Sequence, residues 1–409
     1  MTMVRDAAQR WLTVVGIGED GVAGLGDEAK RAILAASHVF GGKRHLALAA
    51  ELIRGAARPW PTPFDSEMRD VVALHGENVC VLASGDPFLY GVGVTLARAV
   101  PPTEMRVLPA PSSFSLAASR LGWALQDSET ISLHGHAIDL IRPFLHHGAR
   151  IIALTSDGEA PAQIAALIAD SGFGASRLTV LEALGGDSER IRTARANSFG
   201  LENINPLNVL ALEIESGPQA RVLPLASGLA DDLFEHDGQI TKREIRAVTL
   251  STLAPRRGEL LWDIGGGSGS ISIEWMLCHP SLRAIAIEHN AERAERIARN
   301  ATNCGVPGLT VVSSAAPEAL AGLPTPDVVF IGGGGSEPGV FDAAIAALRP
   351  GGRLIANAVT LEMEALLLAR HAALGGELLR LQVSRAAPVG SMTGWRPAMP
   401  VTQWSWVKP

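Results

Sequence analysis

A glycine-rich turn between two apolar segments is the feature of this sequence best suited to binding a ligand. Residues 260–270 read LLWDIGGGSGS, and the apolar segment 284–287 is followed by Glu288. This order predicts a buried strand, a turn that opens a helix, and a second strand whose final carboxylate lies about 20 residues past the turn. In a parallel sheet, a carboxylate at that point reaches the ribose of a nucleoside. The pattern therefore predicts an adenosine-type cofactor in the second half of the chain.

The residue types at this turn favour a cationic group over a pyrophosphate. A dinucleotide site has the spacing G-x-G-x-x-G, but Ser270 stands at the third glycine position. Asp263 precedes the turn, and its carboxylate repels a pyrophosphate but suits a cationic, methionine-like group. The alternatives are a glycine turn needed only for tight packing and a solvated charge at Glu288. We expect the following residues to contact the cofactor: Asp263, Gly265, Gly266, Gly267, Ser268, Gly269 and Glu288.

Two segments that follow later strands complete this candidate site. Ala315 and Ala316 open the sequence AAPEAL, whose backbone and small side chains can frame an adenine ring, with simple helix initiation as the alternative. Gly332 and Gly333 begin a run of four glycines after another apolar segment. Because the carboxyl ends of parallel strands share one edge of a sheet, this run predicts a floor under a bulky substrate. The alternative for the glycine run is a mobile loop.

A second glycine pattern, in the first half, is a weaker signal. Residues 16–21 match G-x-G-x-x-G after a predicted strand, but the next strand, within 37–42, supplies no acid at its end, as a dinucleotide fold requires. Two motifs accompany it, ASGDPFLYG at 83–91 and PAPSSFSLAASRLG at 109–122. The Asp-Pro pair in the first motif predicts a stiff turn that presents a carboxylate and backbone groups. Taken alone, this turn chemistry does not identify a ligand.

Length and composition set limits on the architecture. The 409 residues suggest about two or three domains, and 47% hydrophobic with 19% charged residues excludes a disordered chain. Apolar runs are shorter than the ~20 residues of a membrane span, and residues 1–10 carry no signal core, so we expect a cytoplasmic protein with no membrane partner. The net charge of −7 argues against nucleic-acid binding. Cys80, Cys278 and Cys304 are widely spaced, which predicts three buried thiols and no disulfide or metal site.

Both halves alternate apolar strands with helices, which is typical of an α/β fold. Short apolar runs of this kind suit strands buried on both faces of a mostly parallel sheet. A helix is predicted at 28–36, and Thr241 to Glu244 form a capping box that opens another. The punctuated stretch 217–238 predicts a linker, with a long surface loop as the alternative. The predicted strands are 11–17, 79–83, 151–154, 178–181, 208–212, 260–264, 284–287, 309–312, 327–331 and 353–356.

The second half resembles a known family. The stretch 239–246 (QITKREIR), continued through the glycine turn to the later glycine run, is similar to the decarboxylating C15-methyltransferase domains of corrin biosynthesis. Those domains bind S-adenosylmethionine (SAM) on a class I, Rossmann-like fold, and the tail at 385–404 resembles their C-terminal hairpin region. At Ala315 the family commonly has an acid that meets the adenine amino group, so recognition there falls to backbone groups. The resemblance implies cofactor contacts at Gln239 and Thr241 and substrate contacts at Gly332, Gly333, Arg385 and Arg396.

The first half is similar to the tetrapyrrole (precorrin) methylase family. The motifs at 83–91 and 109–122 carry the resemblance, together with LEALGG at 181–186. This family has a two-lobed α/β fold that differs from class I and binds SAM between its lobes. His136 departs from it, since an arginine often stands there and a histidine is mostly uncharged at neutral pH. The resemblance implies cofactor contacts at Gly16, Gly18, Gly85, Asp86, Pro87, Ser112, Ser113, Leu184, Gly185, Leu207 and Asn208, and substrate contacts at Arg120 and His134.

Together the two resemblances imply a fused α/β enzyme with two SAM sites. They imply a domain at 1–216 that methylates C5 of a precorrin, a linker at 217–238, and a domain at 239–409 that methylates C15 and removes the carboxyl group of a ring acetate. Methyl transfer of this kind depends on positioning and on the exclusion of water, so no catalytic acid or base is assigned. Arginines should bind the carboxylates of the tetrapyrrole.

The resemblance also implies a homo-oligomer, a tetramer through the C-terminal domain. Other functions stay open at this stage. They are methylation of a different tetrapyrrole, a nicotinamide-dependent oxidoreductase, and a SAM-binding regulatory or scaffold protein.

Overall fold

Residues 10–409 are described by the computed structural model, and they divide into two units. The first unit comprises the chain up to His136 and the segment His146–Ala220, and the second comprises Ala137–Leu145 and Arg221–Pro409. The segment 1–9, on which the expectation of no secretory signal rests, lies outside the described residues. Within the described part of the chain, no helix has both the length and the hydropathy needed to cross a membrane.

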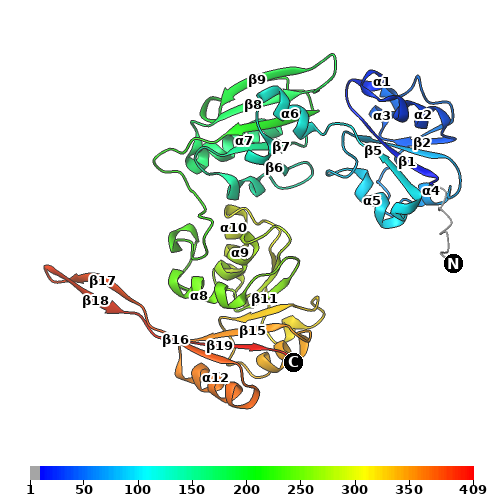
Figure 1. Ribbon diagram of the computed structural model, residues 1–409. Coiled ribbons are helices and arrows are strands. Elements are labelled where there is room, and N and C mark those ends of the chain that lie inside the picture. The colour runs from blue at the N-terminus through cyan, green and yellow to red at the C-terminus, as the bar shows by residue number, and fades with distance from the viewer. Residues whose placement is uncertain (1–9) are drawn as a thin grey trace, which may run out of the picture. The chain divides into compact units, whose positions relative to one another are not determined.

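The first unit begins with a five-stranded parallel sheet of order β3-β2-β4-β1-β5, of which Figure 1 labels β1, β2 and β5. Its central strands, β1 and β4, are mostly apolar and buried because both faces of the sheet are covered. In β1, Val14 packs in the core on one face and Val15 in the core on the other. The predictions at 11–17, 79–83 and 28–36 are confirmed as β1, β4 and α2.

The strands of this sheet are β1 (Leu12–Ile17), β2 (His38–Gly41), β3 (Ala56–Pro59), β4 (Val79–Ser84) and β5 (Met105–Leu108). The helical elements are α1 (Gly21–Gly24), α2 (Asp27–Ala35), α3 (Lys43–Leu48), α4 (Arg69–Val72), α5 (Val92–Ala99) and the 3₁₀ turn η1 (Pro102–Glu104).

A second five-stranded sheet, of order β6-β7-β10-β8-β9, completes the first unit. Strands β6 and β7 run parallel, whereas β10 lies antiparallel to β7 and β8, and β9 lies antiparallel to β8. The expectation of a mostly parallel sheet is therefore wrong for the strands predicted at 151–154, 178–181 and 208–212, although their positions are confirmed. These strands are buried on both faces whichever way their neighbours run, so their composition does not report their direction.

The strands of this sheet are β6 (Glu129–Ser132), β7 (Arg150–Leu154), β8 (Arg177–Glu182), β9 (Arg190–Arg195) and β10 (Asn208–Glu213). The helical elements are α6 (Ser113–Leu121), η2 (Leu125–Asp127), α7 (Ala160–Ile168), the π-helical η4 (Ala169–Phe173) and η5 (Ala196–Ser198).

The second unit holds a seven-stranded sheet of order β13-β12-β11-β14-β15-β19-β16. The first five of these strands are parallel, and β19 runs antiparallel to both β15 and β16. Leu261 and Trp262, adjacent in β11, belong to different cores, one shared with α8 to α10 and the other with α11 and α12. The strands predicted at 260–264, 284–287, 309–312, 327–331 and 353–356 are confirmed as β11 to β15.

The strands are β11 (Leu260–Ile264), β12 (Arg283–Ile287), β13 (Thr310–Val312), β14 (Val328–Ile331), β15 (Arg353–Ala358), β16 (Glu377–Leu381) and β19 (Val401–Val407). The helical elements are η3 (Ile138–Phe144), η6 (Asp231–Leu233), α8 (Arg243–Leu253), α9 (Ser270–Leu277), α10 (Ala291–Asn303), η7 (Glu318–Leu320), α11 (Val340–Ala347) and α12 (Leu361–Leu374).

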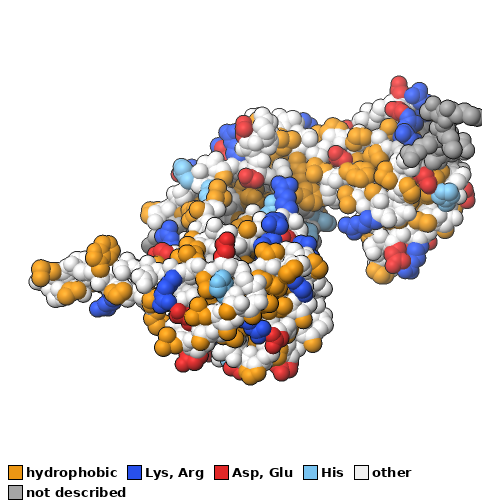
Figure 2. Space-filling model, turned by 60° about the horizontal axis from the view of Figure 1, so that its bottom comes forward, with side chains coloured by type: hydrophobic (Ala, Val, Ile, Leu, Met, Phe, Trp, Pro, Cys, Tyr) orange, Lys and Arg blue, Asp and Glu red, His pale blue; other side chains and the backbone are white. Residues whose placement is uncertain are grey.

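A hairpin of β17 (Ser384–Val389) and β18 (Met392–Pro397) projects from this unit between β16 and β19 (Figure 1). It carries apolar side chains in the open, among them Val389, Met392 and Trp395, which is 77% exposed. Figure 2 shows such side chains gathered along the hairpin. The hairpin expected from the tail sequence is thus present.

The stretch 217–238 contributes to the core of the second unit. Leu223, Leu229 and Phe234 are buried there against α8, α9 and α10. Burial of this many apolar side chains fixes most of the stretch to the second unit, whose boundary with the first falls after Ala220.

The capping box predicted at Thr241 is wrong. Helix α8 begins at Arg243, and its cap residue makes no side-chain hydrogen bond. Thr241 instead offers its backbone carbonyl to the buried guanidinium of Arg246, while Glu244 pairs with Arg385. The carboxylate that the capping box would use is therefore engaged by a tertiary partner, Arg385.

The thiol prediction is also wrong at one position. Cys80 and Cys304 are buried, whereas Cys278 is exposed. Cys278 follows the last residue of α9, where the chain returns to the surface.

Candidate active sites

A cavity of about 1080 Å³ in the second unit opens at the carboxyl ends of β11, β12 and β14. Ligands of open parallel sheets bind at this edge, where the loops after the strands converge. Most residues predicted for this site line the cavity. They are Gln239, Thr241, Asp263, Gly265, Gly266, Gly267, Glu288, Ala315, Ala316, Gly332, Gly333 and Arg385.

Glu288 holds the glycine turn in place. Its carboxylate is 3% exposed and accepts the Gly267 N–H at 2.9 Å and the Asn290 N–H at 3.0 Å. Gly265 has φ +75°, and a Cβ there would lie 2.5 Å from the carbonyl oxygen of Gly333. The turn therefore requires glycine at this position, and it brings the ends of β11 and β14 together under the cavity.

Asp263 is a buried carboxylate in the cavity wall. It accepts the Ser272 N–H at 3.2 Å and the Ser272 hydroxyl at 2.7 Å. Burial raises the pKa of Asp263 to about 6; the two Ser272 bonds oppose this, and the nearby Glu288 adds to it. Two carboxylates thus line one cavity, and a bound cation stabilises their ionised forms.

Ser268 and Gly269, also predicted as cofactor contacts, lie behind the turn and not in the cavity lining. The Ser268 carbonyl accepts the Asn300 amide at 2.9 Å, and a Cβ at Gly269 would lie 2.7 Å from Ile297. Both partners belong to α10, so these residues pack the turn against that helix. Arg396, predicted to contact substrate, is exposed on β18 and lies outside the lining.

Cations that the sequence analysis missed also line the second cavity. Lys242 lies 3.6 Å from Asp231, and Arg293 lies 2.8 Å from Asp237. Arg385, which was predicted, pairs with Glu244. Lys242 and Arg293 lie within a few residues of the motifs at Thr241 and Glu288, and that proximity is the signal that identifies them.

A smaller cavity, of about 370 Å³, is lined by residues from both sheets of the first unit. A neighbouring recess of about 510 Å³ shares part of this wall, including Asp86, Ser112 and Phe114. The predicted residues that line the smaller cavity are Gly18, Gly85, Asp86, Ser112, Ser113, His134, Leu184, Leu207 and Asn208.

The Asp-Pro turn after β4 is closed by a hydrogen bond to its own carboxylate. The carboxylate of Asp86 accepts the Phe88 N–H at 2.9 Å. A Cβ at Gly85, whose φ is +51°, would lie 2.8 Å from the carbonyl oxygen of Pro111. Ser112 caps α6 through its hydroxyl. The turn after β4 and the start of α6 therefore meet at the cavity without room for a larger residue at Gly85.

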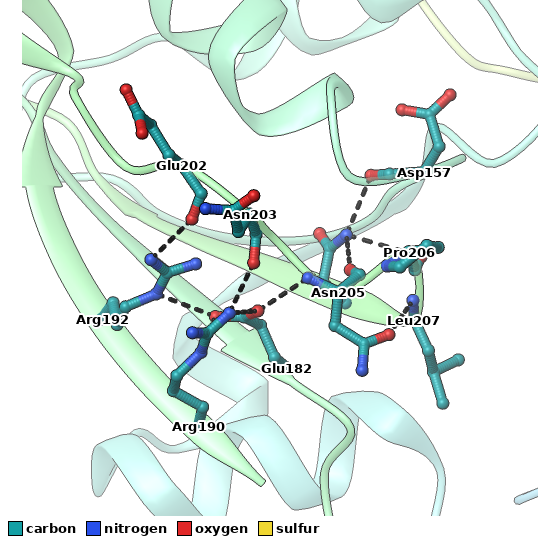
Figure 3. A network of polar contacts seen from close by, with 10 residues as sticks. Asp157, Glu182, Arg190, Arg192, Glu202, Asn203, Asn205, Pro206 and Leu207 are labelled. Atoms are coloured by element: carbon teal, nitrogen blue, oxygen red, sulfur yellow. Dashed lines mark hydrogen bonds and ion pairs between the residues drawn. The ribbon is translucent and has the colours of Figure 1, made fainter. Parts of the chain in front are cut away.

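A buried carboxylate network supports the opposite wall (Figure 3). Glu182, at the end of β8, is 1% exposed and accepts bonds from Arg190 at 2.6 and 3.0 Å, Arg192 at 3.0 Å and the Asn205 N–H at 2.7 Å. Burial raises the pKa of Glu182, but the hydrogen bonds from Arg190, Asn205 and Arg192 outweigh it, and the pKa lies below its ordinary value.

The network fixes the two segments that carry the predicted cofactor contacts on this wall. The N–H of Ala183 donates to the carbonyl of Leu207 at 2.9 Å. The side chain of Asn208 donates to the carbonyl of Asp157 at 2.9 Å and accepts the hydroxyl of Thr155 at 2.6 Å. The turn after β8 and the start of β10 are therefore held as one surface.

The structure does not bring Arg120 to either recess of the first unit. Its guanidinium bonds to Glu189 at 2.6 and 3.0 Å, and Glu189 also accepts the Gly185 N–H at 2.7 Å. Arg120 and Gly185, both predicted as ligand contacts, thus support the turn after β8 from outside the lining.

Gly16 and Pro87 also lie outside the lining. A Cβ at Gly16 would lie 1.9 Å from the carbonyl oxygen of Gly85, so glycine is required there for close backbone packing. The carbonyl of Pro87 accepts the Gly93 N–H at 2.9 Å and closes the turn into α5.

Sequence reasoning missed a polar cluster in this cavity, formed by Glu19, Arg44, His45 and Ser84. Arg44 and His45 follow β2, close to the strand end where a dinucleotide fold has an acid. The rule that ligands bind past the carboxyl ends of parallel strands applies equally to the Arg44 cation there.

Comparison with known proteins agrees with this arrangement. Residues 11–199 match the family described as tetrapyrrole (corrin/porphyrin) methylases, and residues 232–408 match a precorrin methyltransferase domain. The chain is similar to the precorrin-6Y C(5,15)-methyltransferase [decarboxylating] of Sinorhizobium sp., with 65% identity over 97% of this chain and 96% of the relative.

Two further proteins match about half of the chain each. A cobalt-precorrin-6B C(15)-methyltransferase (decarboxylating) of Salmonella typhimurium is 34% identical over 42% of this chain and 92% of its own. The crystal structure of the C-terminal domain of precorrin-6Y C5,15-methyltransferase from Rhodobacter capsulatus is 51% identical, covers 46% of this chain and 100% of its own, and has a TM-score of 0.44. The full-length match, with both halves of the chain represented, places this protein in the precorrin-6Y C(5,15)-methyltransferase (decarboxylating) family.

Proposed function

We propose that each unit binds one molecule of SAM and transfers one methyl group to precorrin-6Y. The first unit would methylate C5, and the second would methylate C15 and remove the acetate carboxyl group. As a member of its family the chain is a SAM-dependent, decarboxylating C-methyltransferase of cobalamin biosynthesis. The proposal assigns C5 methylation to a domain at 1–216 and C15 methylation to a domain at 239–409.

The pair of buried carboxylates in the second cavity carries the proposal for that unit. Glu288 lies at the strand end where a ribose diol binds, and it can accept two hydroxyl hydrogen bonds. Asp263 supplies the negative charge that suits the sulfonium and ammonium groups of SAM. The close approach of Gly265 to Gly333 leaves backbone at the floor of the site, and Ala315 and Ala316 offer small side chains beside an adenine.

In the first unit the fit rests on backbone and small polar groups. Gly85 and Ser112 form one wall of the cavity, and Leu184, Leu207 and Asn208 form the other. Apolar side chains on one wall suit an adenine ring, and the hydroxyl and backbone groups on the other suit the polar end of the cofactor. The network around Glu182 would keep this second wall in position.

Methyl transfer in each unit then depends on how the chain positions the cofactor and the tetrapyrrole. SAM supplies an electrophilic methyl group when it is bound. The walls of each cavity orient the tetrapyrrole carbon and exclude water, which can lower the barrier by about 7–11 kcal/mol. Lys242, Arg293 and Arg385 would bind substrate carboxylates in the second cavity. Because the conjugated ring accepts the electron pair of the broken C–C bond, the chain needs to desolvate and orient the acetate carboxylate that leaves as carbon dioxide.

Replacing Glu288 with alanine tests this division of labour. In the full-length chain we expect Glu288→Ala to weaken SAM binding at the second site by roughly 1–3 kcal/mol, because the ribose loses a charged acceptor. At a SAM concentration that saturates the first site and leaves the weakened second site mostly empty, the product should carry one added methyl group, at C5, and keep all of its carboxyl groups. Calorimetric titration and mass spectrometry of the product measure both effects.

Two variants serve as controls for this experiment. Glu288→Gln keeps an acceptor for the Gly267 N–H and should retain more affinity than the alanine variant. Glu292→Ala removes an exposed glutamate of α10 and should change affinity by less than about 0.5 kcal/mol. Loss of both methylations, or carbon dioxide release at the normal rate, in Glu288→Ala would contradict the assignment of C15 chemistry to the second unit.

We also propose that the protein is a homo-oligomer assembled through its C-terminal domain, as a tetramer. A two-stranded hairpin has little stability of its own in water, and β17 and β18 expose Val389, Met392 and Trp395. Contact with another copy of the chain would cover these side chains.

A further inference from the structure

The polar cluster in the first cavity has no part in the site described so far. Among the described residues that line this cavity, Arg44 is the one with a permanent positive charge. Arg44 is the second residue of α3, the helix that follows β2, and lies next to His45. Ser84 ends β4, and Glu19 follows β1. Three neighbouring strand ends thus converge on one guanidinium.

The guanidinium of Arg44 is held by two neutral acceptors on one side. Its Nη2 lies 3.0 Å from Nε2 of His45 and 3.0 Å from the hydroxyl of Ser84, which lies 2.8 Å from the same His45 nitrogen. A guanidinium only donates, so Nε2 of His45 carries the lone pair. Burial, and then the charge of Arg44, lower the pKa of His45 to about 4, so this ring is neutral near pH 7.

On its other side Arg44 meets a charged partner that a ligand can replace. Nη1 pairs with the carboxylate of Glu19. The Arg44 and Glu19 side chains are 39% and 21% exposed, so the pair faces the open cavity and is not sealed in the core. Exchange of one carboxylate for another on the same guanidinium costs little desolvation.

We propose that Arg44 binds a carboxylate of the tetrapyrrole in the first unit and that Glu19 is the internal anion which this carboxylate displaces. The inference rests on the proposed function of this unit, because it takes the polycarboxylate substrate from it. His45 and Ser84 keep Nη2 in place when Glu19 leaves, and Nη1 is then free to donate a charge-assisted hydrogen bond to a substrate carboxylate. Arg44 takes the role that the sequence analysis assigned to Arg120.

Two substitutions with opposite expected effects test the proposal. Arg44→Met should raise the KM for the tetrapyrrole in C5 methylation about 10- to 100-fold, because a charge-assisted pair is lost. Arg44→Lys should recover part of this loss. Glu19→Gln frees Arg44 from its internal partner and should lower the same KM about two- to fivefold.

The KM for C15 methylation at the second site is the internal control for each variant, and we expect it to stay unchanged. Equilibrium binding of the tetrapyrrole, measured with S-adenosylhomocysteine present, should follow the same order without any turnover. A Glu19→Gln chain that binds the tetrapyrrole more weakly than wild type would overturn the proposal. It would show that the Arg44–Glu19 ion pair has only a structural role. An Arg44→Met chain with unchanged affinity would overturn the proposal as well.

The binding measurement also separates this proposal from the one on which it rests. A wild-type chain that fails to methylate C5 contradicts the proposed function of the first unit. The order of affinities among the Arg44 and Glu19 variants still decides whether Arg44 binds the tetrapyrrole.

Discussion

Replacing Arg246 with methionine is expected to lower the free energy of unfolding of the second unit by about 3–5 kcal/mol. Arg246 is fully buried and donates to Glu274 at 2.5 Å and to Asp231 at 3.2 Å, and its guanidinium lies 4.9 Å from the centre of the Phe234 ring. Methionine fills similar space but leaves Glu274, which is also buried, without its cation. Urea denaturation followed by circular dichroism measures the change.

The same substitution should reach the cofactor site. Arg246 also donates to the backbone carbonyls of Leu229 and Thr241, and Thr241 lines the second cavity. Loss of these bonds loosens the stretch that leads into the cavity wall, so SAM affinity should fall at the second site and stay unchanged at the first.

Two comparisons separate the buried charge from a general effect of losing an arginine. Arg299 pairs with Glu235 at 3.0 Å, with both side chains about half exposed, so Arg299→Met should cost less than about 1 kcal/mol. Adding Glu274→Gln to Arg246→Met removes the unpaired buried charge and should restore part of the stability. Equal stability of Arg246→Met and Arg299→Met would contradict the buried ion cluster.

The second large effect is a pH dependence that Asp263 gives to SAM binding. Burial raises its pKa to about 6 in the folded chain, and a cation binds the ionised form. One pH unit below that pKa about a tenth of the carboxyl groups are ionised, so affinity at the second site should fall about tenfold between pH 7 and pH 5. Titration of the ligand itself affects both sites equally, which makes the first site the internal reference.

The stability of the SAM-free second unit should change in the opposite direction. The folded pKa of Asp263 lies above the ordinary value of about 4, so its contribution is fully present below that value and is lost as the pH rises through about 6. The loss between pH 4 and pH 7 should be about 2 kcal/mol.

Asp263→Asn keeps an acceptor for Ser272 and removes the charge. It should abolish the pH dependence of SAM affinity at the second site and make the SAM-free unit more stable near pH 7. An Asp263→Asn chain that keeps a tenfold loss of affinity toward pH 5 would show that another group is responsible.

The class I half was predictable because its motif is contiguous. The segment from β11 through the glycine turn to Glu288 spans one strand, one helix and the next strand, so periodicity and residue type place its groups at one sheet edge. Within the motif, the sequence did not separate residues that face the cavity from those behind it. Ser268 and Gly269 pack against α10, and that contact depends on where the helix lies.

In the first unit, contacts between residues far apart in the sequence could not be predicted. Arg120 bonds to Glu189, which lies 69 positions away, and a pair so far apart produces no periodic pattern in the sequence from which it could be predicted. Arg44 and Ser84 are 40 positions apart and meet because β2 and β4 are neighbours in the sheet. Strand direction was equally hidden, since β8 and β10 are buried on both faces in an antiparallel arrangement as they would be in a parallel one.

Calorimetric titration of the full-length protein with SAM tests the central claim, that one chain holds two distinct cofactor sites. We expect two molecules bound per chain, with Glu288→Ala removing or weakening one of them and leaving the other at its wild-type affinity. A stoichiometry of one SAM per chain, or a single class of sites that Glu288→Ala weakens throughout, would contradict it.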